Sequence, residues 1–85
     1  MMTVKNKNKL TLDRPAIYQI IVPGVLKKTW VHVDGEISVI FGQDDDDMPI
    51  TTLTITVDQA GLHGLMRRLY SLGLPLLSVN IVEVP

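Results

Sequence analysis

The sequence predicts an α+β domain in which one helix packs on one face of an antiparallel sheet of four to five strands. Three observations support this prediction. Residues 52–57 alternate between threonine and an apolar side chain, which is the period of a strand with one buried face. Residues 58–73 space their leucines as an amphipathic helix does, between an aspartate and a glycine. Strand patterns lie on both sides of this helix, in the order β-(β)-β-β-α-β, which favours a helix layer on a sheet.

The first strand is predicted at residues 16–22, which are rich in β-branched side chains and end at the turn signal Pro23-Gly24. Its two alternating sets are both apolar, one with Ile17 and Ile21 and the other with Tyr18, Ile20 and Val22. A strand that is apolar on both sides is typical of the middle of a sheet. We therefore expect residues 16–22 to form a central strand.

Residues 30–33 and 36–41 are predicted as two strands joined by a turn at the Asp-Gly pair between them, because Asp-Gly tolerates the positive φ of a type I′ turn. The second strand is the firmer assignment, whereas residues 30–33 could also form a bend. The four consecutive acids at 44–47 repel one another, and Pro49 cannot donate a ladder hydrogen bond. This segment is therefore predicted to be a loop.

The strand at residues 52–57 places its three threonines on one face, so one face of the sheet is expected to be polar. Asp58 then stands at the N-cap position of the helix, and Gly73 supplies a left-handed stop. The apolar stripe of the helix consists of Leu62, Leu65, Met66, Leu69 and Leu72. Residues 76–84 form the last strand. A right-handed crossover between the last two strands leaves room for residues 16–22 between them.

Composition restricts the function classes. Eight basic and nine acidic residues leave a net charge of −1, so no nucleic-acid partner is expected. The absence of cysteine excludes disulfides, thiol nucleophiles and thiolate metal sites, and it fits a cytoplasmic location. No apolar stretch has the length of a signal or membrane segment, so no membrane partner is expected. We expect residues 1–14 to be a flexible N-terminal arm and residues 15–85 to be a single domain.

The helix and the strand after it carry a recognisable string, Val-Asp-Gln-Ala-Gly-Leu-His-Gly-Leu at 57–65 and Leu-Gly-Leu-Pro-Leu-Leu-Ser-Val-Asn at 72–80. This string resembles the C-terminal signature of a family of small uncharacterised bacterial proteins. The resemblance implies no established activity, so it implies no catalytic residue for this chain.

His63 is the one candidate acid-base group on the helix, and Gln59 and Tyr70 lie on the same side of the helical wheel. These three side chains are the candidates for binding a small ligand. The favoured interpretation is that His63 stands at the border between core and solvent without a ligand. Because neither a nucleophile nor a second acid accompanies His63, we predict no catalytic residue, no cofactor and no metal.

Two surfaces are candidates for association. Gly64 lies opposite the leucine stripe, where the absence of a side chain would allow another backbone to approach. The sheet face away from the helix is predicted to carry apolar side chains, namely Tyr18, Ile20, Val22, Ile40 and Val82. A domain of 85 residues has a small core, so pairing with a second copy is a plausible source of extra stability.

The sequence therefore favours a non-enzymatic protein-interaction or regulatory module that acts as a homodimer, with a further, unidentified protein partner left open. The alternative prediction is a small-ligand-binding sensor domain with its ligand near Gln59 and His63. An enzyme that uses His63 is the third hypothesis.

Overall fold

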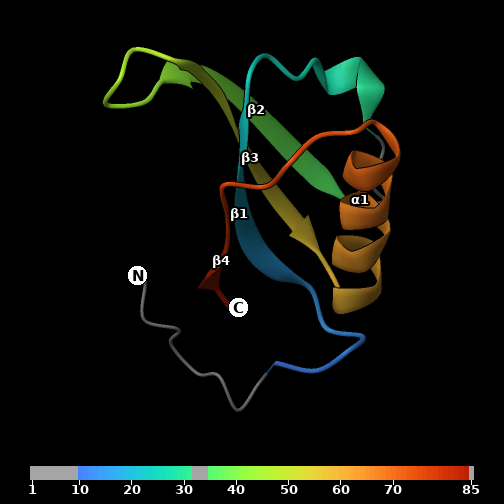
Figure 1. Cartoon of the computed structure of the whole chain (residues 1–85). Helices are drawn as coiled ribbons and strands as arrows, with labels where there is room; N and C mark the ends of the chain where they lie inside the picture. The colour runs from blue at the N-terminus through green and yellow to red at the C-terminus, as the bar shows by residue number, and fades with distance from the viewer. Residues whose placement is uncertain (1–9, 32–34, 85) are drawn as a thin grey trace.

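The computed structural model describes residues 10–31 and 35–84. These residues contain four strands, one α-helix and one short 3-10 helix. In chain order these are β1 (Ala16–Pro23), the 3-10 helix η2 (Lys28–Trp30), β2 (Glu36–Gln43), β3 (Pro49–Val57), α1 (Gln59–Ser71) and β4 (Ser78–Glu83). Figure 1 shows the helix packed beside the sheet. All neighbouring strands are antiparallel, and their order in the sheet is β2-β3-β1-β4. The predicted α+β class and the central place of β1 are confirmed.

Two connections cross over a strand. β1 and β2 run in the same direction with β3 between them, and β3 and β4 run in the same direction with β1 between them. In βαββαβ folds each crossover of this kind carries a helix. Here α1 occupies the second crossover, whereas the first holds only the short η2. One full helix therefore covers a sheet whose strand arrangement has room for two.

The ends of α1 follow the predicted chemistry. The Asp58 carboxylate accepts a hydrogen bond from the Gly61 amide at 2.7 Å. At the other end Gly73 has a φ of 75° and donates to Tyr70, while Leu74 donates to Leu69. These two bonds form a Schellman motif, which satisfies the last helical carbonyls. Leu62, Leu65 and Leu69 of the predicted stripe are buried, Met66 is partly buried, and Leu72 is 39% exposed.

The register of β1 with β3 decides which side of the sheet faces α1. The even-numbered residues of β1 stand opposite the odd-numbered residues of β3. Both sets are buried: Ala16, Tyr18, Ile20 and Val22 of β1, and Thr51, Leu53, Ile55 and Val57 of β3. The predicted position of Tyr18, Ile20 and Val22 on the face away from the helix is therefore wrong. Because β1 is apolar on both sides, its own pattern cannot tell the faces apart, and its pairing with the alternating strand β3 does so.

The other two members of that predicted set have different outcomes. Ile40 does point away from the helix, opposite Thr52, and is 61% exposed. Val82 is half-buried and lies where the register between β4 and β1 shifts.

The predicted hairpin at residues 30–41 is not formed as expected. Trp30 ends η2, and Val31 is buried but belongs to no strand, while residues 32–34 lie outside the described residues. The hairpin of the structure joins β2 to β3 through residues 44–48. Pro49 is the first residue of β3 rather than part of the loop. Its carbonyl accepts from the Gly24 amide at 2.7 Å, and the Gly24 carbonyl accepts from the Thr51 hydroxyl at 2.8 Å instead of from an amide at position 49.

The predicted N-terminal arm is described only from Leu10 onward. Leu10 packs against the core, and the Leu12 carbonyl accepts a hydrogen bond from the Gln59 amide at 3.2 Å. The part of the arm at residues 1–9 lies outside the described residues. No helix in the part of the chain that the structure describes is long and apolar enough to cross a membrane.

Candidate functional site

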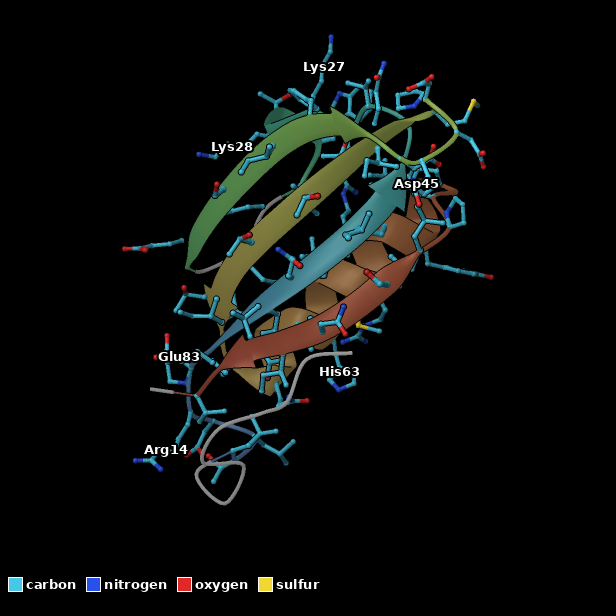
Figure 2. The ribbon with its side chains drawn as sticks, turned by 90° about the vertical axis from the view of Figure 1, so that its left-hand side faces the viewer. Arg14, Lys27, Lys28, Asp45, His63 and Glu83 are labelled. Atoms are coloured by element: carbon cyan, nitrogen blue, oxygen red, sulfur yellow. The ribbon has the colours of Figure 1, made fainter. Side chains whose placement is uncertain are left out.

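Gln59, His63 and Tyr70 share one side of α1, but they do not converge on a common point. His63 is exposed, and Figure 2 shows it pointing away from the sheet. Tyr70 is 84% exposed. It lies seven residues beyond His63, which is roughly 10 Å along a helix axis. The ligand-binding role of these residues stays a prediction.

Gln59 already has a partner on the sheet. Its side-chain amide donates to the hydroxyl of Tyr18, which is only 3% exposed. Burial raises the pKa of Tyr18, the hydrogen bond from Gln59 lowers it, and the nearby Asp58 carboxylate raises it. The net effect is a raised pKa, so the phenol stays protonated at neutral pH. This pair ties β1 to the first turn of α1 and is a structural contact.

The two helix glycines have different surroundings. A Cβ at Gly61 would lie 3.0 Å from Val57 Cβ and 3.3 Å from an Asp58 carboxylate oxygen. A Cβ at Gly64 would have no atom within 4 Å among the described residues. Gly61 therefore allows α1 to start close to the end of β3. Gly64 lies on the exposed surface of α1, and its role in association stays a prediction.

We expect Gly64→Ala to raise the free energy of unfolding by about 0.5–1 kcal/mol, because alanine favours a helix and fills open space there. Gly61→Ala is the matched control in the same helix. It should gain less or lose stability, because its methyl group meets Val57 at 3.0 Å. Urea unfolding followed by circular dichroism measures both. If Gly64→Ala instead weakens association between copies, Gly64 is a contact residue as the sequence suggested.

The side of the sheet opposite α1 forms a broad surface with an uncharged centre, which Figure 2 shows in front of the helix. We call it the open sheet face. Its uncharged side chains come from all four strands and are Ile17, Gln19, Ile21, Ser38, Ile40, Thr52, Thr54, Thr56, Ser78 and Asn80. Most of them are half-buried by their neighbours in the sheet, whereas Ser38 and Ile40 are exposed.

Charged side chains lie at both ends of the open sheet face. Glu36 at the start of β2 is opposite Thr56 and Glu83 at the end of β4 is opposite Ile17, so both belong to this face and stand at one end of it. The hairpin with Asp44 to Asp47 stands at the other end, where Figure 2 labels Asp45. An uncharged centre with charges at its margin is the composition of a protein-protein interface.

The sequence pattern missed Ile17, Gln19 and Ile21 as members of this face. The threonine alternation of β3 could have found them, if the pairing of β1 with β3 had been known. The Ser78 hydroxyl, also on this face, is buried without a hydrogen-bond partner among the described residues.

The described residues contain no group of three or more His, Asp or Glu side chains arranged to hold a metal ion. Among the acids of the 44–48 hairpin, Asp44 is engaged with the backbone of the hairpin itself. The Asp44 carboxylate accepts from the amides of Asp46 at 2.8 Å and Met48 at 2.9 Å. This arrangement is that of a tight turn at the end of two strands.

Comparison with known proteins identifies a family without an assigned activity. No curated protein and no solved structure matches the chain. The model of one family, described as a domain of unknown function (DUF8691), matches residues 17–80. This match runs from β1 into β4 and includes the helix and most of the open sheet face. The chain therefore belongs to the DUF8691 family.

Proposed function

We propose that the protein is a non-enzymatic protein-interaction or regulatory module that acts as a homodimer, with the open sheet face as the contact between the two copies. The observation that carries this proposal is the uncharged centre of that face, whose only acids, Glu36 and Glu83 among the paired residues, stand at one end, in a chain of which 20% of residues are charged. A sheet face that is meant only for water has no reason to keep lysine and glutamate out of its centre. Three isoleucines among short polar side chains suit close packing of two such faces.

The size of the face supports a specific contact. Four strands spaced about 4.8 Å apart, with six to eight residues of about 3.3 Å each, give a footprint of roughly 450 Å² per copy. Two copies would then bury on the order of 1,000 Å² in total, which is at the lower limit for a specific interface. Such a contact is isologous, because the same patch serves both copies. We therefore expect a reversible dimer of moderate affinity.

The charges at the margin set the salt dependence of this dimer. Glu36, Glu83 and the 44–47 acids frame the face at both ends, so any face-to-face pairing brings acidic groups of the two copies toward each other. Salt screens this repulsion, while it leaves the burial of isoleucine in place. We expect the dimer to be tighter at high than at low ionic strength.

The experiment compares the wild-type chain with Ile21→Lys and Thr54→Lys by sedimentation velocity over a wide concentration range. Each substitution buries two ammonium groups in the dimer, one per copy. It should therefore raise the dissociation constant of the dimer by about 100-fold or more. Tyr70→Lys is the matched control, because Tyr70 is 84% exposed on the other side of the molecule. Circular dichroism verifies that all variants are folded.

A wild-type chain that stays monomeric at the highest concentration contradicts the proposal. A dimer that survives both lysines on the open sheet face, but dissociates with Tyr70→Lys, places the contact on α1 instead.

A further inference from the structure

We propose that the outer edge of β2 binds an extended peptide segment of a partner protein, which adds a fifth strand to the sheet and carries basic residues at both of its ends. This inference concerns a surface at right angles to the open sheet face. It therefore does not require the homodimer to form.

The free backbone groups of β2 follow from its pairing with β3. The Asp44 amide donates to the Met48 carbonyl at 2.9 Å, which makes Asp44 and Met48 a hydrogen-bonded pair next to the hairpin turn. In an antiparallel ladder such pairs alternate with pairs whose backbone groups point outward. Ile37, Val39, Phe41 and Gln43 therefore direct their amides and carbonyls to the edge. We call these backbone groups the β2 outer edge, and no other described segment makes a backbone hydrogen bond to them.

The β2 outer edge lacks the features that normally prevent strand addition. Between Glu36 and Gln43 the sequence has no lysine, arginine or proline, and the ladder with β3 runs over eight pairs without a register shift. The other edge strand differs. β4 has six residues, its register shifts near Tyr18, and it ends at Glu83. Of the two edges, β2 is the longer and the more regular template.

The side chains beside this edge would form an apolar surface for an added strand. Ile37 and Val39 are half-buried on the helix side, and Phe41 is 55% exposed there. On the opposite side Ile40 is 61% exposed. An added strand can pack alternate apolar side chains against both sets while its backbone pairs with β2, which is the usual mode of peptide recognition by a sheet edge.

The charges at the ends of β2 argue for a partner peptide rather than a second copy. Glu36 stands at one end and the acids 44–47 at the other. If two copies of β2 paired antiparallel, the acidic start of one strand would lie beside the acidic hairpin of the other, and these groups repel. A peptide with lysine or arginine at both ends meets opposite charge at both ends. Lys27 and Lys28 belong to the connection that crosses to β2, and Figure 2 shows them beyond the outer side of that strand. The basic residues of a partner peptide therefore belong at its two ends and not in its middle.

The test uses a blocked synthetic peptide, Lys-Lys-Val-Thr-Val-Thr-Val-Lys-Lys, titrated into the full chain and followed by amide NMR and hydrogen exchange. We expect new protection at the outward amides of Ile37, Val39 and Phe41. Binding should weaken as salt rises, which is opposite to the expected behaviour of the dimer. The same peptide with glutamate in place of lysine, and a version N-methylated on alternate backbone amides, should both fail to bind.

Two variants at position 41 separate the contribution of the backbone amide to peptide binding from that of the side chain. Phe41→Pro removes an outward amide without a loss in the β2–β3 ladder, and it should weaken peptide binding by about tenfold or more. Phe41→Ala keeps that amide and should weaken binding less. If protection appears on β4 instead, or if the glutamate peptide binds equally well, the proposal is wrong.

A second copy is the competing occupant. If the outward β2 amides of the free chain become protected as its own concentration rises, β2 pairs with itself and the proposal is overturned. Repeating the titration with Ile21→Lys separates the two proposals, because loss of the dimer through the open sheet face should leave peptide binding unchanged.

Discussion

Gly35→Ala is expected to lower the free energy of unfolding by about 3 kcal/mol or more. Gly35 precedes β2, and a Cβ at this position would lie 2.1 Å from the Thr56 carbonyl oxygen, with Val57 Cγ1 at 3.2 Å. The oxygen belongs to the backbone of β3, opposite Glu36 in the ladder, so it cannot move without disturbing that pairing. The structure must therefore part β2 from β3 at this end to admit a methyl group.

Gly42→Ala is the matched control for this prediction, because Gly42 lies in the same strand and an added Cβ there would have no atom within 4 Å among the described residues. It should change stability by less than about 1 kcal/mol, and in the stabilising direction if it changes at all. Chemical denaturation of both variants measures the difference. Equal midpoints for the two would mean that the close approach of Gly35 to Thr56 does not exist in solution.

Thr51→Val is expected to cost about 2–4 kcal/mol of stability. The Thr51 hydroxyl accepts from the Leu26 amide at 2.9 Å and donates to the Gly24 carbonyl at 2.8 Å. Both Thr51 and Leu26 are fully buried. Valine keeps the shape of threonine but leaves a buried amide and a carbonyl without a partner, each of which costs about 1–3 kcal/mol. These two hydrogen bonds hold the β1–β2 connection against the sheet, where a βαββαβ fold has a helix.

Thr51→Ser provides the comparison, because serine keeps the hydroxyl and loses one buried methyl group, worth roughly 1 kcal/mol. Unfolding by urea gives the stabilities, and hydrogen exchange at the Leu26 amide reports the local effect. Valine should speed exchange at Leu26 much more than serine does. If serine costs as much as valine, the methyl group rather than the hydrogen bonds holds this connection.

The local elements of the fold were largely predictable from the sequence. Asp58, the leucine stripe and Gly73 identify α1, because caps and helical periodicity act within one segment of chain. The alternation of Thr52, Thr54 and Thr56 identifies β3 for the same reason. Local sequence patterns did not predict the path of the chain at Trp30 and Val31. An Asp-Gly pair permits a type I′ turn, but Trp30 and Val31 belong to a connection whose path is set by burial and by the hydrogen bonds of Thr51.

The candidate surfaces were predictable only in part. An apolar face away from the helix was expected, and Ile40 lies on the open sheet face as predicted. The residues of β1 on that face are instead Ile17 and Ile21, since Tyr18, Ile20 and Val22 form the core under α1. The β2 outer edge could not be inferred without the hairpin hydrogen bond at Asp44, because sequence alone does not say which backbone groups point outward.

By itself, then, the sequence determined the α+β class, the helix with both of its ends, the polar character of one sheet face and the place of β1 between two strands. These properties arise from interactions within a few residues or from simple chain connectivity. Only the tertiary structure decided which side of β1 is core, why Gly61 differs from Gly64, and which strand edge is free. The physical reason is that each depends on a neighbour distant in sequence. β3 selects the buried face of β1, Val57 limits the space at Gly61, and the order of the strands leaves β2 and β4 each with one unpaired side.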